Sequence, residues 1–96
     1  MTRRTVFKFR LYVAGDAQNS AQARTNLAAL CNEHLAGRHE IEVIDVLRHP
    51  GRALADSVFM TPTLVRLAPS PLRKIVGTLS QADTVLHSLG IETEPA

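Results

Sequence analysis

Cysteine is almost absent from this sequence, because Cys31 is the only thiol in the 96 residues. One thiol cannot form an internal disulfide, and enzymes that exchange disulfides place their reactive cysteine at a helix N-terminus, where the thiol pKa falls. The junction between the first predicted strand and the first predicted helix, residues 15–20, reads Gly-Asp-Ala-Gln-Asn-Ser. The sequence therefore excludes disulfide exchange, and Cys31 is predicted to be a small core residue on a helix.

Other chemical signatures are missing as well. No apolar run approaches the ~20 residues of a membrane span, and there is neither a Gly-x-Ser-x-Gly motif nor a phosphate-binding loop. Tyr12 and the three phenylalanines are core candidates and form no RNA-binding patch. The histidines match no metal-ligand spacing. They are His34, His39, His49 and His87. We therefore predict a cytoplasmic protein without catalytic residues, cofactor or metal, and without nucleic-acid or membrane partners.

Charge is low overall but unevenly distributed. The formal net charge is +2 and the isoelectric point about 9.2, too mild for the footprint of a nucleic-acid binder. Residues 1–15 carry four cations and no acid, and residues 48–76 carry five cations against Asp56. This asymmetry leaves two interpretations open: a basic face for an acidic partner surface, or an ordinary solvated face.

The hydrophobic pattern predicts one α/β domain. Period-two alternation indicates strands at 6–13 and 41–47, and three-to-four spacing indicates a helix over 21–35, with Asn19 or Ser20 as its N-cap. A short helix from Pro50 to near Phe59, strands at 64–67 and 72–76, and a last helix capped by Ser80 complete the chain. Gly37 and Gly90 stand at the C-terminal cap positions of the first and last helices.

The order is β-α-β-α-β-β-α, a parallel βαβ unit followed by an antiparallel hairpin and a terminal helix. This is a thioredoxin-like arrangement. The run Met60-Thr61-Pro62-Thr63-Leu64 fits it, since such domains place a cis proline at the start of the third strand. Asp45, inside the second strand, is either a proton acceptor or, as we favour without a cysteine pair, a salt-bridging or strand-ending residue.

Several linked motifs resemble the KaiB family of bacterial circadian clock proteins, over residues 5–90. They are residues 11–15 (Leu-Tyr-Val-Ala-Gly), 19–20 (Asn-Ser), 43–47 (Val-Ile-Asp-Val-Leu), 61–64 (Thr-Pro-Thr-Leu) and 69–80 (from Pro-Ser-Pro to Gly-Thr-Leu-Ser). The resemblance implies a non-enzymatic protein that binds the N-terminal ATPase ring of a hexameric KaiC-type kinase and modulates its phosphorylation cycle. KaiA or an output histidine kinase are further implied partners. The alternative is a sensor module for a histidine kinase, or a stress-linked paralogue.

The resemblance also implies two folds for one chain. A fixed half, about residues 5–50, is shared by both, whereas about residues 51–96 rearrange in a resting homo-oligomer, a dimer or tetramer. We assign the switch to residues in this second half. They are Pro62, Pro69, Pro71, Ser88 and Gly90. Ser88 stands where the family commonly has glycine, and Gly90 where it commonly has aspartate. Ser88 continues a helix better than glycine does, so we expect the final helix, and with it the thioredoxin-like state, to be somewhat better supported than is usual in the family.

The predicted partner-binding residues are charged. They are Glu40 and Glu42 of the second strand and the basic run Arg66, Arg73 and Lys74. These choices rest on charge alone, and the competing interpretation is a solvated surface.

Overall fold

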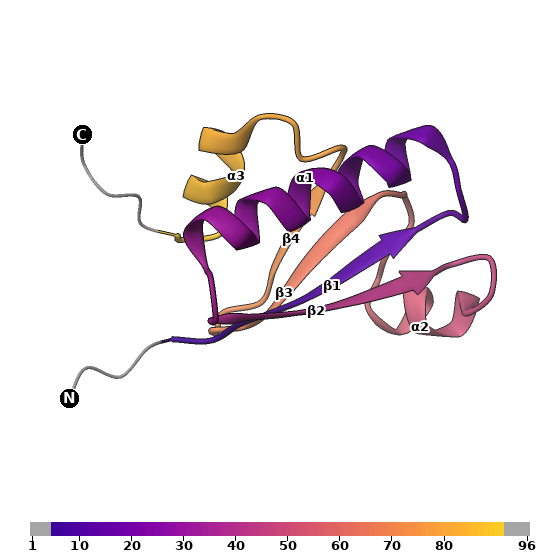
Figure 1. Cartoon of the computed structure of the whole chain (residues 1–96). Coiled ribbons are helices and arrows are strands. Elements are labelled where there is room, and N and C mark those ends of the chain that lie inside the picture. The colour runs from indigo at the N-terminus through magenta and orange to yellow at the C-terminus, as the bar shows by residue number, and fades with distance from the viewer. Residues whose placement is uncertain (1–4, 92–96) are drawn as a thin grey trace.

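A computed structural model describes residues 5–91 of the chain. The seven elements follow the predicted order, as Figure 1 shows. They are β1 (Phe7–Val13), α1 (Gln18–His34), β2 (His39–Asp45), α2 (Pro50–Ala55), β3 (Thr63–Ala68), β4 (Arg73–Val76) and α3 (Ala82–Ser88). The strands form one sheet in the order β2-β1-β3-β4. Strand β1 is parallel to β2 and antiparallel to β3, and β3 is antiparallel to β4.

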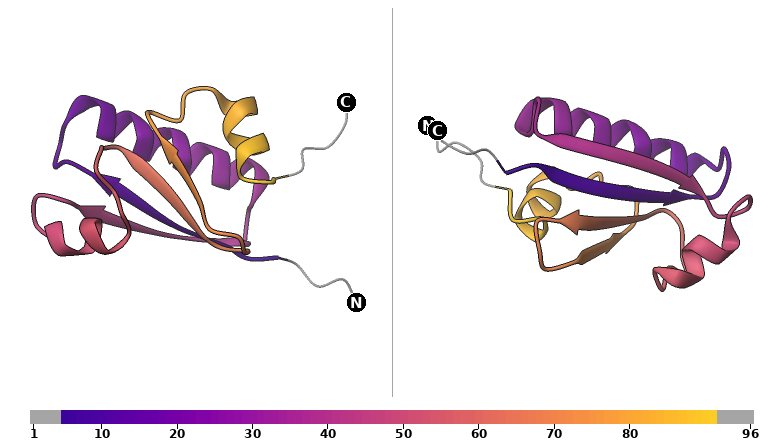
Figure 2. Two further views of the ribbon diagram at one scale, coloured as in Figure 1. Left: turned by 180° about the vertical axis from the view of Figure 1, so that it is seen from behind. Right: turned by 90° about the horizontal axis from the view of Figure 1, so that it is seen from below.

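The larger core lies on the face of the sheet that α1 and α3 cover (Figure 2). Odd-numbered residues of β1, including Phe9 and Leu11, point into it, because side chains alternate across a strand. Leu27 and Leu30 of α1 meet them, and Leu86 of α3 closes the cluster. Cys31 is buried there too, so the prediction of a small core residue is confirmed, and burial raises its pKa to about 11.

A smaller core lies on the opposite face. Tyr12, Ile44 and Val65 point from β1, β2 and β3 toward α2, which adds Ala53, and Val58 follows just after the helix. Because α2 has only six residues, it covers only the end of the sheet near the arrowheads of β1 and β2 (Figure 1). The rest of this face includes the charged side chains of Arg10, Glu42 and Lys74.

The observed ends of the elements differ from the predicted ones for identifiable reasons. Helix α1 begins at Gln18 and has no side-chain cap, because the hydroxyl of Ser20 accepts the N–H of Ala14 instead. Strand β2 ends at Asp45, whose carboxylate accepts the backbone N–H groups of Gly15 and Leu47.

The last two helices are also shifted. Helix α2 stops at Ala55, short of Phe59, because Ser57 has a φ of 56°. Helix α3 begins at Ala82 with Gln81 as N-cap, so the Ser80 cap was wrong. Gly90, after α3, has the positive φ of 70° that was predicted for a C-terminal cap. The cis peptide predicted before Pro62 is present, and those before Pro69 and Pro71 are cis as well.

Candidate partner-binding surface

The strand register places one row of side chains across the face that α2 leaves uncovered. Glu42 of β2 lies opposite Arg10 of β1, Arg10 lies opposite Val65 of β3, and Val65 lies opposite Lys74 of β4. Cross-strand partners share a face of the sheet, so these four residues form a continuous strip. Three of the four are charged, and the strip runs from one edge of the sheet to the other.

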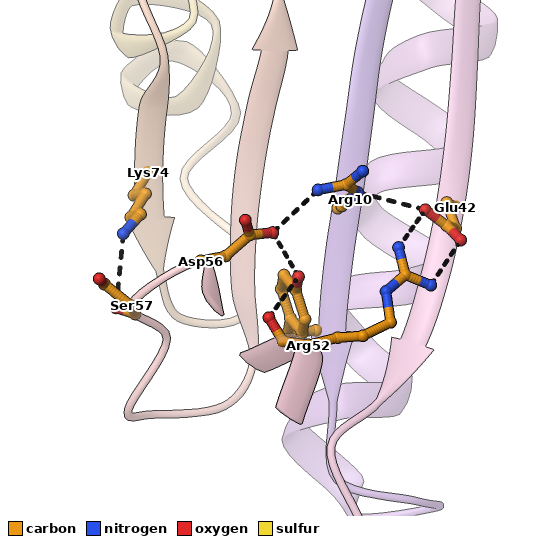
Figure 3. Close-up of polar contacts among 7 residues, drawn as sticks. Arg10, Glu42, Arg52, Asp56, Ser57 and Lys74 are labelled. Carbon is orange, nitrogen blue, oxygen red and sulfur yellow. Dashed lines mark hydrogen bonds and ion pairs between the residues drawn. The ribbon is translucent and has the colours of Figure 1, made fainter. Parts of the chain in front are cut away.

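Ion pairs connect this strip to α2 (Figure 3). Both carboxylate oxygens of Glu42 accept hydrogen bonds from Arg52, at 2.8 and 2.9 Å, and Arg10 Nε lies 3.2 Å from the same carboxylate. Arg10 Nη1 donates at 3.1 Å to Asp56, just after α2. The fork of Arg52 matches a carboxylate in geometry, which makes this the best-formed pair on the surface. These bonds lower the pKa of Glu42 to about 2, with the Arg52 hydrogen bond as the largest cause.

Tyr12 of β1 connects this network of ion pairs to the sheet. Its ring is fully buried, and its hydroxyl donates to the Asp56 carboxylate and lies 3.2 Å from the carbonyl oxygen of Arg52. The Tyr12 hydrogen bond is the largest cause that lowers the pKa of Asp56, and Arg10 adds to it. Burial, followed by the Asp56 bond, raises the pKa of Tyr12 to about 12. Asp56 is therefore a carboxylate held by two donors, and it sets the position at which the next loop begins.

Hydrogen bonds and the buried side chain of Val58 hold the loop between α2 and β3, residues 56–62. The carbonyl of Ser57 accepts a hydrogen bond from Lys74 at 3.4 Å (Figure 3). Val58 is buried, and its N–H donates to Ala53 at 2.8 Å. Thr63 Oγ1 donates to the carbonyl of Met60. These contacts fix the path of the loop in the structure.

This ordered loop displays two adjacent apolar side chains. Phe59 is 80% exposed and Met60 is 63% exposed. We call Phe59 and Met60 the apolar prong. Large apolar side chains exposed together on a surface are typical of protein-binding sites. Sequence reasoning missed the prong, although its signal was an apolar pair that belongs to no helical or strand period.

The structure separates the five charged residues that the sequence grouped. Glu40 and Glu42 are exposed on the same face of β2, and Lys74 shares that face through its pairing with Val65. Arg73 is exposed but points to the opposite face, beside α3, because it is adjacent to Lys74 on the same strand.

Arg66 requires a correction. It was expected in one exposed basic run with Arg73 and Lys74, but its side chain is buried under α3 and only 5% of the residue is exposed. In this arrangement it cannot meet a partner directly.

Asp45 is a structural residue at the end of β2. It accepts backbone N–H groups from Gly15 at 3.1 Å and Leu47 at 2.9 Å, and Arg48 lies 3.9 Å away. The bond from Leu47 is the largest cause that lowers its pKa. This fits the strand-ending interpretation. Among residues 5–91 there is no group of three or more histidine, cysteine, aspartate or glutamate side chains that could hold a metal ion.

Comparison with known proteins identifies the family. A family model described as the KaiB domain matches residues 10–91. The chain belongs to the KaiB family. It is 40% identical over 85 residues to the circadian clock protein KaiB3 of Synechocystis sp., covering 88% of this chain and 83% of the relative. It is 39% identical over 90 residues to the circadian clock oscillator protein KaiB of Gloeothece citriformis, covering 94% and 85%.

Solved structures define the fold of this KaiB family member. Mitochondrial thioredoxin 3 of Saccharomyces cerevisiae is similar with a TM-score of 0.71 and 17% identity, over 91% of this chain and 79% of the other. The N-terminal domain of Synechococcus elongatus SasA is similar with a TM-score of 0.61 and 16% identity, over 100% and 94%. The thioredoxin-like α/β fold predicted from the sequence is therefore confirmed. No helix within residues 5–91 is long and apolar enough to cross a membrane.

Proposed function

We propose that this protein is a cytoplasmic, non-catalytic clock or regulatory protein that binds the N-terminal ATPase ring of a KaiC-type hexamer and modulates its phosphorylation cycle. One observation carries the proposal: a member of the KaiB family presents an ordered apolar prong beside a strip of charged side chains. A rigid apolar anchor surrounded by polar groups is the usual composition of an interface centre. KaiA or an output histidine kinase are proposed further partners.

The proposed interface has two parts. The centre is Phe59 and Met60, and the hydrogen bonds that hold their loop reduce the entropy cost of ordering it on binding. The rim is Glu40, Glu42 and Lys74 on the open face of the sheet. Because Arg10 and Arg52 already neutralise Glu42, we assign more of the charge recognition to Glu40 and Lys74.

Binding to a KaiC homologue, with ATP analogue or ADP bound, tests the proposal. We expect Phe59→Ala and Met60→Ala to weaken binding at least about tenfold each, since truncating a buried anchor costs on the order of 2 kcal/mol. Leu72→Ala is the matched control. Leu72 is also apolar and 53% exposed, but it lies in the β3–β4 turn, at the end of the β3–β4 pair that is far from the apolar prong. Absence of binding by the unmodified protein in both nucleotide states would overturn the proposal.

A second pair of variants identifies which face of the sheet binds the partner. Lys74 and Arg73 are adjacent cations on opposite faces of β4, so Lys74→Glu and Arg73→Glu change the net charge equally. We expect only Lys74→Glu to weaken binding. If only Arg73→Glu weakens it, the α3 side of the sheet is the interface and the apolar prong is not part of it.

The proposal includes a second arrangement of the single domain, in which residues 51–96 rearrange in a homo-oligomer. Leu72, Ile75, Val76 and Leu79 support it, because this strand and loop segment also has helical spacing. The switch residues proposed from the family stay predictions. They are Pro62, Pro69, Pro71, Ser88 and Gly90, and the residues after Ile91 lie outside the described structure. Light scattering combined with NMR across protein concentration tests this part; one monomeric species without slow exchange would contradict it.

A further inference from the structure

Arg66 is a buried cation that has no carboxylate partner among residues 5–91. It stands on β3 and points toward α3. Its Nη1 donates to the carbonyl of Leu89, at the end of α3, and its Nη2 donates at 2.6 Å to the carbonyl of Pro71, in the turn between β3 and β4. Its Nε is buried without a hydrogen-bond partner. The two carbonyl groups are thus its only described polar partners.

The electrostatic setting of Arg66 is unfavourable. Desolvation lowers its pKa, and so does Arg73, which lies directly opposite on β4. Two like charges in a cross-strand pair repel each other. Burying a charge is costly unless hydrogen bonds compensate for lost water. The bonds to Leu89 and Pro71 therefore hold the guanidinium inside against a tendency to move into solvent.

The carbonyl of Leu89 needs a donor as well. The last carbonyls of a helix have no partner within the helix, and they carry its partial negative charge. Leu89 lies just past α3 and is itself buried, so Arg66 supplies what the helix cannot. Gly90 allows the backbone to pass close to the Arg66 side chain. A Cβ atom added at position 90 would lie 3.3 Å from Nη1 of Arg66, and the φ of Gly90 is 70°.

We propose that Arg66 is a clamp that couples the end of α3 to the β3–β4 turn, so that the two segments detach together. When either carbonyl leaves, the guanidinium and its unpartnered Nε gain access to water, and the repulsion from Arg73 falls as the side chain moves away. Loss of one bond therefore favours loss of the other. The clamp concerns only contacts within this chain, so it goes beyond the proposed function and does not depend on any partner.

Amide hydrogen exchange measured by NMR on the full chain tests the clamp. The reporters are the amides of Leu89 and Ile91, which donate to carbonyls of α3, and the amides of β4. Arg66→Met removes all the donors but retains an apolar stem. Arg66→Lys retains the charge, but an ammonium group cannot bridge two carbonyls as a planar fork does. Arg73→Met is the matched control, since it removes the neighbouring cation and no clamp bond.

We expect Arg66→Met and Arg66→Lys to accelerate exchange at least tenfold in both α3 and β4, and to leave the β1–β2 pair unchanged. Arg73→Met should leave both segments unchanged or slow their exchange. Acceleration in only one segment, equal acceleration in β1 and β2, or no acceleration would overturn the proposal. If Arg66→Met does not fold, Arg66→Lys decides it by the same readout.

Discussion

Replacing Tyr12 with phenylalanine tests how strongly the sheet holds α2 and the loop that follows it. The substitution keeps the ring, which is fully buried among Ile44, Val65 and their neighbours. It removes only the hydroxyl, which donates to Asp56 and lies 3.2 Å from the carbonyl of Arg52. The effect therefore measures the polar contact and not the packing.

The expected loss in the free energy of unfolding is ~2 kcal/mol, because a hydrogen bond to a charged group contributes ~1.5–3 kcal/mol. With a urea m-value of about 1–2 kcal/mol/M for a chain of this size, the unfolding midpoint should fall by ~1–2 M.

Urea unfolding of Tyr12→Phe and Asp56→Ala, singly and together, supplies the measurement. The double-mutant cycle should give a coupling of ~1 kcal/mol or more, since the two groups are in direct contact. Ser80→Ala, which removes an exposed hydroxyl, is the control and should change stability by less than ~0.5 kcal/mol. A Tyr12→Phe loss below ~0.5 kcal/mol would refute the reasoning.

The stability of the protein at alkaline pH tests the contact between Tyr12 and Asp56 independently. The folded-state pKa of Tyr12 is raised, so its contribution is complete below pH 10 and is lost as the pH rises from 10 to 12. The difference in stability between the unmodified protein and Tyr12→Phe should therefore shrink across that interval. A difference that stays constant up to pH 12 would assign the effect to something other than the phenolic proton.

Two further predictions concern the ionisable groups of the cores and the surface. The thiol of Cys31 is buried with a pKa raised to about 11, so a thiol reagent at pH 8 should react only as fast as the protein unfolds; rapid reaction in native buffer would contradict this. The pKa of Glu42 is lowered to about 2, so its contribution to stability is complete above pH 4.5 and is lost as the pH falls toward 2. In an NMR carboxyl titration, Arg52→Met should return that pKa toward 4.5 by more than Arg10→Met does, and the reverse order would show that the bidentate pair is not dominant.

The element order was predictable because local patterns determine it. Alternation in β1, three-to-four spacing in α1 and the glycines that follow α1 and α3 are contained in short stretches of sequence. The element ends were less predictable, because distant contacts decide them. Ser20 could have capped α1, yet its hydroxyl bonds the backbone of the preceding loop. Asp45 ends β2 by bonding the N–H of Gly15, 30 residues earlier.

The candidate surface depended even more on distant contacts. Arg73 and Lys74 are neighbours in sequence, so a charge count groups them, but a strand sends them to opposite faces. The burial of Arg66 follows from where α3 ends, and the bond between Arg10 and Asp56 joins residues 46 positions apart. No local pattern contains the register that brings these groups together.

The sheet order has a consequence for self-association. Strands β2 and β4 are the two outer strands of the sheet within residues 5–91, and in this part of the chain no strand pairs with the backbone N–H and C=O groups on their outer sides. Such rows can template pairing with another extended chain, and natural proteins limit this with short outer strands and charged side chains. Strand β4 has only four residues and carries Arg73 and Lys74, while β2 carries Glu40 and Glu42. Glu40, Glu42 and Lys74, which we propose for partner binding, are therefore also expected to disfavour edge-to-edge pairing of the sheet.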